Sequence, residues 1–125
     1  MAIHDLTKVE EQIMQVLWRL KKAFVKEIVN EFPDPKPAYT TTSTIIRILE
    51  SKGFIGHHAY GRTHQYYPLI SKEEYKRYET RKLLDNYYGN SAKSMLSFFV
   101  KEEKMDINDL DEILQMINKI KDNAK

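Results

Sequence analysis

Polar side chains that can bind an anion or the edge of a base recur at helical spacing between residues 40 and 47. Thr40, Ser43, Thr44 and Arg47 lie at positions i, i+3, i+4 and i+7, which places them on one face of a helix. Short hydroxyl groups bond phosphates or base edges, a threonine methyl can meet a thymine methyl, and arginine can pair with guanine or clamp a phosphate. Residues 35–49 contain no Asp or Glu. The pattern favours contact with duplex DNA over the alternative, a merely solvated polar face.

Further hydrogen-bond donors lie before and after this stripe in the sequence. Tyr39 comes at the start of the helix, where it can reach a phosphate. Arg62 and His64 lie in and just after a Gly-containing turn between two β-prone runs, and the first run carries His57 and His58. We expect Arg62 and His64 to lie along the backbone or minor groove of DNA. Zinc held by the histidines is the alternative, but no carboxylate lies within this hairpin to complete a ligand shell, so we predict no metal.

The elements that position these residues are predicted from caps and periodicity. Capping boxes at Thr7–Glu10 and Ser71–Glu74 begin helices, and Ser91 and Asp106 can cap two more. Thr42, Ile45, Ile46 and Leu49 form the apolar face opposite the polar stripe. The order is three helices, a hairpin over 54–68 and three helices. It predicts a mainly α fold with a small β-hairpin wing: a winged helix-turn-helix over residues 1–70, then a C-terminal helical dimerisation segment over 71–125.

The C-terminal segment carries apolar faces but is too short to build a large core alone. A second copy of the chain is its simplest partner. We therefore predict a homodimer; an intrachain helical bundle is the competing interpretation. The expected interface residues are Met95, Leu96, Phe99, Leu110, Ile113, Leu114 and Ile117.

Composition limits the remaining classes of function. The 125 residues include no cysteine, which excludes disulfides, thiol nucleophiles and thiolate metal centres. No apolar run approaches the roughly 20 residues of a membrane helix, and the N-terminus lacks a signal-peptide pattern, so we expect a cytoplasmic chain without membrane insertion. No nucleophile elbow or phosphate-binding glycine loop occurs, and we predict neither an enzyme nor a cofactor.

Four stretches in order give the chain a resemblance to the penicillinase/methicillinase repressors, winged-helix transcriptional regulators of bacteria. The stretches are LTKVEEQIMQVLW from Leu6, TTTSTIIRILESKGFI from Thr40, YYPLISKEEY from Tyr66 and SMLSFFVKEE from Ser94. The resemblance implies a homodimer that binds a palindromic DNA operator through the third helix and wing and represses a resistance or stress gene.

The same resemblance implies that a signal inactivates the repressor. Members of the family are typically paired with a membrane sensor for β-lactams and are inactivated by proteolysis before a Phe that matches Phe99. The preceding residue is commonly Asn in the family and is Phe98 here. The alternative function is a winged-helix protein-interaction module without DNA binding, which the net charge of only +2 favours.

Overall fold

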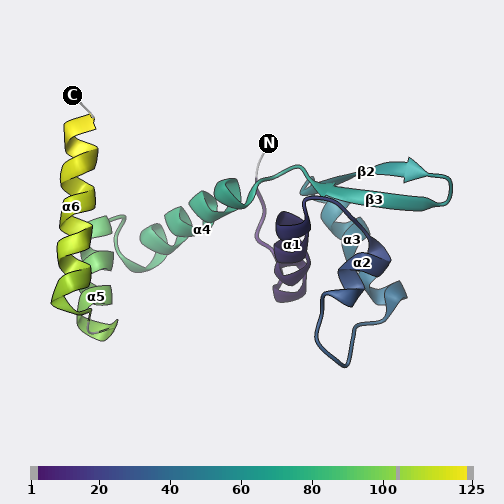
Figure 1. Cartoon of the computed structure of the whole chain (residues 1–125), viewed down its shortest axis with the longest axis horizontal. Helices are drawn as coiled ribbons and strands as arrows, with labels where there is room; N and C mark the ends of the chain where they lie inside the picture. Colours follow the sequence, from purple (N-terminus) through teal and green to yellow (C-terminus); the bar gives the residue numbers. More distant parts are fainter. Residues whose placement is uncertain (1–2, 104, 124–125) are drawn as a thin grey trace. The chain divides into compact units, whose positions relative to one another are not determined.

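The structure is a computed structural model that describes residues 3–103 and 105–123 (Figure 1). The chain divides into two compact units, one up to Glu79 and one from Thr80 onward. The elements are α1 (Lys8–Leu20), β1 (Ala23–Phe24), α2 (Val25–Asn30), α3 (Tyr39–Ser51), β2 (Ile55–Tyr60), β3 (Thr63–Pro68), α4 (Lys72–Tyr87), α5 (Ala92–Glu103) and α6 (Ile107–Asn123).

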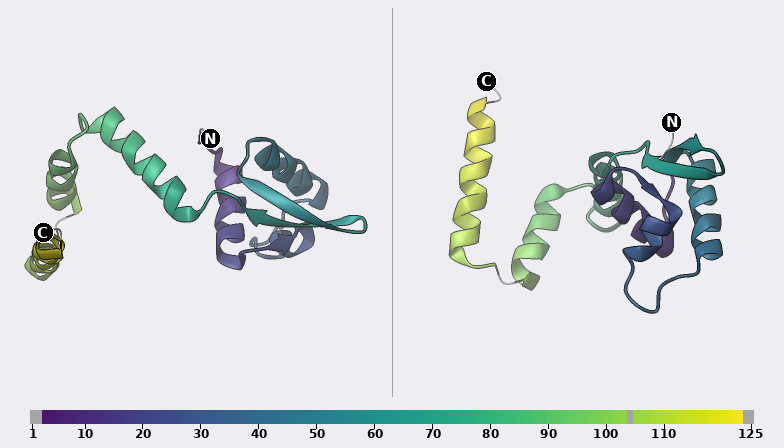
Figure 2. Two further views of the ribbon diagram at one scale, coloured as in Figure 1. Left: turned by 90° about the horizontal axis from the view of Figure 1, so that it is seen from above. Right: turned by 45° about the vertical axis from the view of Figure 1, so that its right-hand side comes forward.

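The first unit is a three-helix core with a small sheet, and it confirms the predicted fold class. An antiparallel sheet of order β1-β3-β2 packs with α1, α2 and α3, and the β2–β3 hairpin extends beyond the helices (Figure 2). The centre of the core consists of side chains at most 1% exposed: Ile13, Met14, Leu17, Ala23, Ile28, Ile46, Leu49, Phe54 and Ile55. Burial of this apolar surface is the main force that holds the helices on the sheet.

The predicted helix caps are confirmed. The amide of Glu10 donates to the Thr7 hydroxyl at 3.2 Å, and the Thr7 amide donates to the Glu10 carboxylate at 2.8 Å. Ser71 and Glu74 repeat this exchange at the start of α4. The side chains of Ser91 and Asp106 accept amide hydrogen bonds at the starts of α5 and α6. These local bonds satisfy donors that a helix start otherwise leaves unpaired.

The hairpin has a two-residue turn that fixes its register. Tyr60 pairs with Thr63, which leaves Gly61 and Arg62 as the turn. Gly61 has a φ of 62°, and a positive φ at the first turn residue is the requirement of a type II′ turn. Pairing then runs to Ile55 and Pro68. The third strand, β1, was not predicted from the sequence; its two residues pair with Gln65 and Tyr66 of β3.

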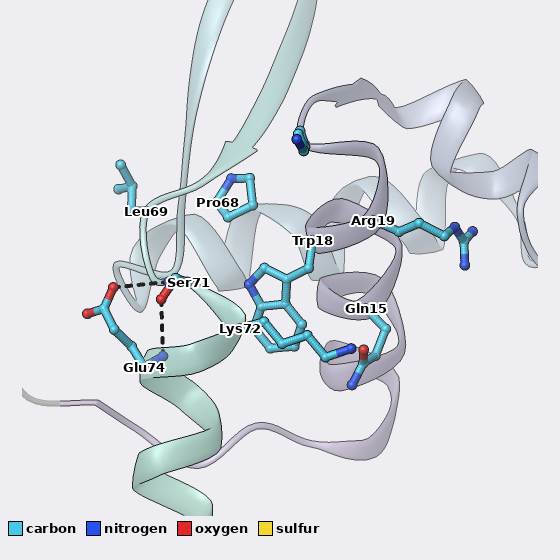
Figure 3. Close-up of a pocket in the computed structure, with 9 residues that line it drawn as sticks. Gln15, Trp18, Arg19, Pro68, Leu69, Ser71, Lys72 and Glu74 are labelled. Carbon is cyan, nitrogen blue, oxygen red and sulfur yellow. Dashed lines mark hydrogen bonds between the residues drawn. The ribbon is translucent and has the colours of Figure 1, made fainter. Parts of the chain in front are cut away.

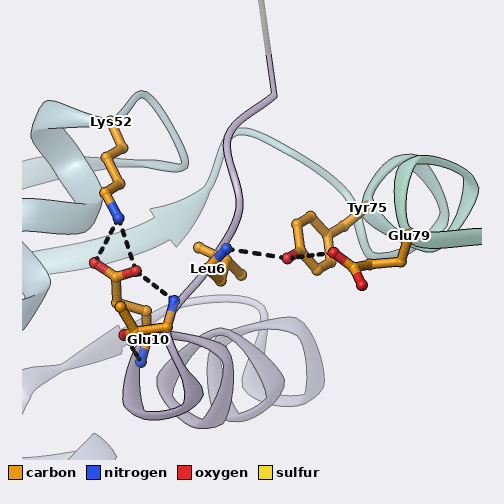
Figure 4. Close-up of polar contacts among 6 residues, drawn as sticks. Leu6, Glu10, Lys52, Tyr75 and Glu79 are labelled. Carbon is orange, nitrogen blue, oxygen red and sulfur yellow. Dashed lines mark hydrogen bonds and ion pairs between the residues drawn. The ribbon is translucent and has the colours of Figure 1, made fainter. Parts of the chain in front are cut away.

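An ion pair between the buried Glu10 and the half-buried Lys52 joins the start of α1 to the end of α3 (Figure 4). The Lys52 ammonium lies 2.8 and 2.9 Å from the two carboxylate oxygens of Glu10, which is 3% exposed. Burial raises the pKa of Glu10, but hydrogen bonds from Lys52 and the Thr7 amide, with the Lys52 charge, bring it below its ordinary value. Glu10 therefore stays ionised at neutral pH.

Replacing Glu10 by glutamine is expected to destabilise the first unit in a pH-dependent way. Because the pKa of Glu10 is lowered by folding, its ionised form stabilises the protein above its ordinary pKa of 4.5, and that contribution is lost as the pH falls through the folded value. Urea unfolding of Glu10→Gln should show a loss of about 1–3 kcal/mol at pH 7 and a smaller loss at pH 3. The exposed Glu11→Gln is the control. An equal loss at both pH values would contradict the role of the charge.

A second set of long-range hydrogen bonds ties the N-terminal segment to α4 within the first unit (Figure 4). The Leu6 amide donates to the Tyr75 hydroxyl at 3.1 Å, and that hydroxyl donates to Glu79 at 2.9 Å. Burial, together with the Glu79 carboxylate, raises the pKa of Tyr75 to about 12. Tyr75 therefore keeps its proton, and it can accept and donate at the same time.

The second unit contrasts with the first because its helices bury little. None of the described side chains between residues 80 and 123 is buried. On α6 the apolar residues Ile107, Leu114, Met116, Ile117 and Ile120 are between 42% and 76% exposed. Within the described residues, no helix is long and apolar enough to cross a membrane.

Candidate nucleic-acid interface

The two faces of α3 separate as the sequence pattern predicts. Thr42, Ile46 and Leu49 are at most 2% exposed and Ile45 is half-buried. Thr40, Thr44 and Arg47 are exposed, and Ser43 is half-buried. The buried Thr42 is tolerated because its hydroxyl donates to the Ala38 carbonyl at 3.0 Å. Packing therefore holds a helix rich in β-branched residues and leaves its polar stripe outward.

Two clefts border this outward stripe, and Arg47 lines both. The first, which we call the wing cleft, lies between α3, the hairpin and the start of α2; it is lined by Phe24, Val25, Lys26, Tyr39, Ser43, Arg47, Arg62, Thr63, His64 and Tyr66. The second, which we call the N-terminal cleft, is lined by His4, Asp5, Thr44, Arg47, Ile48, Ser51 and Lys52. Six of the seven residues predicted to contact DNA thus line one of two adjoining clefts; the seventh, Thr40, is exposed in the first turn of α3.

The wing cleft is positively charged. Its lining includes Lys26, Arg47 and Arg62 and no carboxylate. Lys26 is a residue that sequence reasoning missed, because it belongs to the short α2 and has no spacing relation to the α3 stripe. A cleft lined by positive charges alone attracts a polyanion more strongly than the net charge of +2 suggests.

Two other lysines near α3 have structural roles. Lys52 forms an ion pair with Glu10, and the Lys36 ammonium donates to the carbonyls of Asn30 and Phe32 at 3.2 and 2.7 Å, at and just beyond the end of α2. Their charges therefore stabilise the ends of helices and the contacts between them. The cations that stay open toward the clefts are Arg47, Arg62 and Lys26, for which no ion pair occurs among the described residues.

The start of α3 differs from the starts of the other helices of twelve or more residues that the structure describes. Its N-cap is Ala38, which makes no side-chain hydrogen bond, and its first turn contains no acidic residue. Thr7, Ser71, Ser91 and Asp106 cap α1, α4, α5 and α6. The amides of the first turn of α3 and the positive end of its dipole are therefore not neutralised by a side chain, next to Tyr39 and Thr40.

The Thr44 hydroxyl of the α3 stripe already donates a hydrogen bond within the helix. The Thr44 hydroxyl donates to the Thr40 carbonyl one turn earlier at 3.0 Å. A phosphate oxygen needs a donor, so Thr44 can serve it only by giving up this bond, while its methyl and its lone pairs stay available to a base edge. The Ser43 hydroxyl has no hydrogen-bond partner in the described part of the chain and is free to donate.

The wing histidines are arranged by the strand register. His57 and His64 lie on one face of the hairpin, with ring centroids 4.1 Å apart and nearly parallel planes, while His58 stacks on Tyr67. Glu50 of α3 lies 2.5 Å from the Nδ1 of His57. The sequence did not indicate this carboxylate, because it lies outside the hairpin. In the described residues, no group of three or more His, Cys, Asp or Glu side chains could hold a metal ion.

A third cleft in the first unit lies away from the α3 stripe (Figure 3). It is formed by the end of α1, the residues after β3 and the start of α4, and Trp18 lines it while its indole nitrogen donates to the Ile70 carbonyl at 2.9 Å. None of the predicted DNA contacts lines it. Ser71 and Glu74, which also line it, exchange the hydrogen bonds of the α4 capping box (Figure 3).

The residues predicted to form a dimer interface are exposed or half-buried in the second unit. Met95, Leu96 and Phe99 of α5 line an apolar cleft together with Leu83, Tyr88, Phe98 and Glu102. On α6, Leu110 and Ile113 are half-buried, and Leu114 and Ile117 are 57% and 42% exposed. Phe98 and Phe99 are 53% and 50% exposed within helix α5.

Three packed helices, a small antiparallel sheet and a hairpin beside the outward face of α3 define a winged-helix DNA-binding protein. A family model described as penicillinase repressor matches residues 6–119. The chain belongs to this family of DNA-binding transcriptional repressors. The resemblance predicted from the four sequence stretches is thereby confirmed.

Individual relatives agree with this assignment. The penicillinase repressor of Bacillus licheniformis is 23% identical over 98% of this chain and 97% of its own length. The methicillin resistance regulatory protein MecI of Staphylococcus aureus is 25% identical over 93% of this chain and 95% of its own length. Among solved structures, the DNA-binding domain of the repressor BlaI is 27% identical with a TM-score of 0.52, over 59% of this chain and 92% of that one.

Proposed function

We propose that the chain is a homodimeric repressor in the cytoplasm that binds a two-fold symmetric DNA operator and blocks transcription. The observation that carries the proposal is the arrangement of the α3 stripe between two clefts, with open cations at its centre and in the wing cleft. In this proposal α3 enters the major groove and the hairpin follows the adjacent backbone. Family membership supports the repressor class.

Each predicted contact has a distinct role in this proposal. Arg47 pairs with a guanine or clamps a phosphate at the centre of the stripe, and Ser43 donates to a phosphate or base. Tyr39 and Thr40 approach a phosphate at the uncapped start of α3. Arg62 and His64 contact the backbone from the wing, and Lys26 joins them from α2. Thr44 contacts a base edge, because its hydroxyl proton is already used.

The salt dependence of DNA binding tests this proposal. Each phosphate neutralised by a cation releases counterions, so the logarithm of affinity should fall linearly with the logarithm of salt concentration. We expect a duplex enriched by the full chain from a random pool to lose affinity steeply between 50 and 200 mM salt. Arg62→Ala and Lys26→Ala should each reduce the slope by about one per half-site. A chain that enriches no duplex, or binds independently of salt, would favour the protein-interaction module.

The dimer is proposed to form through the second unit. Its apolar residues on α5 and α6 are exposed or half-buried in the single chain, which supports an interface with a second copy over an intrachain bundle. A second copy supplies the complementary surface, and two-fold symmetry then matches two half-sites of the operator. We also propose a DNA-binding domain and a dimerisation domain, with the boundary predicted between residues 70 and 71. The first two turns of α4 belong to the same compact unit as the DNA-binding residues.

Release from the operator is proposed to follow cleavage between Phe98 and Phe99 by a membrane sensor protease. Both side chains are about half exposed, but the bond lies within α5, so the helix must open locally before a protease can bind it. Cleavage there would separate α6 from the rest of the proposed interface. Mass spectrometry of fragments from cells that express a candidate sensor would identify the bond that is cut.

A further inference from the structure

The N-terminal cleft points to a DNA contact outside the helix and the wing. One wall is the flank of α3 formed by Thr44, Ile48 and Ser51, which are spaced by four and three residues. The opposite wall is the segment before α1, represented by His4 and Asp5. Arg47 lines this cleft and the wing cleft, so the N-terminal segment adjoins the proposed interface directly.

The N-terminal segment is held in place by two tyrosines of α4. The Tyr78 hydroxyl donates to the Asp5 carboxylate at 2.6 Å, and the Leu6 amide donates to the Tyr75 hydroxyl at 3.1 Å. Tyr75 is itself buried and packs against Phe54 and Trp18. These bonds join residues about seventy positions apart, and they fix a segment that lies outside the helices and strands.

Of the polar side chains around this cleft, His4 is the one in the N-terminal segment that remains open. It is exposed, and it has no hydrogen-bond or ion-pair partner in the described residues. Asp5 accepts from Tyr78, and Lys52 is paired with Glu10. A strand that follows this flank of α3 would therefore meet donors on His4 and Arg47.

We propose that His4 contacts a phosphate of the operator, and that Tyr75 and Tyr78 position the N-terminal segment as the second wall of the interface. The proposal rests on the proposed function. A helix in the major groove has a phosphate backbone on each of its two sides. The wing cleft faces one backbone, and the N-terminal cleft faces the other. Because a phosphate contact carries no base information, His4 should contribute equally on operator and unrelated duplexes.

A charge series at position 4 tests the contact in the full chain. We expect affinity for the enriched duplex to decrease in the order His4→Lys, wild type, His4→Ala, His4→Glu, with His4→Ala weaker than wild type by about 3- to 10-fold. The salt slope should be steeper for His4→Lys than for His4→Ala by about one per half-site. Gln12→Lys and Gln12→Glu, on the exposed side of α1 outside both clefts, control for net charge.

These measurements distinguish a failure of the His4 contact from a failure of the proposed function. Equal affinities and slopes for all four residues at position 4, together with weak binding by Arg47→Ala, would overturn the His4 contact and leave the repressor assignment intact. Failure of the wild-type chain to bind any duplex would overturn the proposed function itself. If the variants at position 4 change the affinity by no more than the Gln12 variants do, the His4 contact is also overturned. The change in affinity would then come from net charge alone.

A double-mutant cycle tests the positioning role of Tyr78. Tyr78→Phe keeps the ring and removes the hydroxyl that holds Asp5. We expect it to weaken DNA binding of the wild-type chain by about 2- to 3-fold and to have no further effect in a His4→Ala background. The same loss in both backgrounds would overturn the positioning role, since the tyrosine would then act independently of His4. Circular dichroism of each variant reports whether the fold is retained.

Discussion

Replacing Arg47 by alanine should cause the largest loss of operator affinity of any single change among the predicted DNA contacts. The guanidinium lines both clefts at the centre of the outward stripe and has no ion-pair partner in the described residues. A bidentate arginine contact contributes about 1–3 kcal/mol of discrimination, and the proposed dimer uses it twice. We therefore expect a loss of about 2–6 kcal/mol on a symmetric duplex, measured by mobility shift or fluorescence anisotropy.

Two further variants decide what Arg47 recognises. Arg47→Lys keeps the charge and loses the planar pair of donors, so it should retain most of the salt slope and lose discrimination between operator and unrelated duplexes. Arg77→Ala, an exposed arginine of α4 that lines neither cleft, is the matched control and should bind as the wild type does. If Arg47→Ala binds with unchanged affinity, α3 is not the recognition helix and the proposed interface is wrong.

Replacing Leu114 by aspartate should convert the proposed dimer into monomers. Leu114 is 57% exposed in the single chain, so a charge there is solvated in the monomer and costs little. The same charge buried against the apolar face of a second copy costs several kcal/mol, and that penalty would apply twice in a symmetric interface. Sedimentation equilibrium should show the shift in mass, and operator affinity should fall by about 10³-fold or more as binding becomes non-specific.

The neighbouring residue provides the control for this prediction. Gln115→Asp introduces the same charge one position along α6, at an exposed site outside the apolar stripe, and should leave both the dimer and DNA binding intact. A Leu114→Asp chain that stays dimeric would place the interface elsewhere. A monomer that binds the operator as tightly as wild type would show that dimerisation is not needed for recognition.

The long helices, the hairpin and the outward face of α3 can be predicted from the sequence alone. The caps at Thr7, Ser71, Ser91 and Asp106 and the positive-φ Gly53 after α3 depend on hydrogen bonds and backbone freedom within a few residues, so they can be inferred from spacing alone. The division of α3 into a buried and an open face follows from helical periodicity, which is equally local.

Which charges remain open, and which segments lie beside α3, depends on the packing of the whole first unit. Lys52 looks like a surface lysine until Glu10, 42 residues earlier in the chain, is brought within 2.8 Å of it. Strand β1 has two residues and exists because β3 pairs with it. Lys26 and His4 reach the borders of the α3 stripe only because α2 and the N-terminal segment pack on either side of it. Such contacts arise from folding the whole unit, and no periodicity within one segment encodes them.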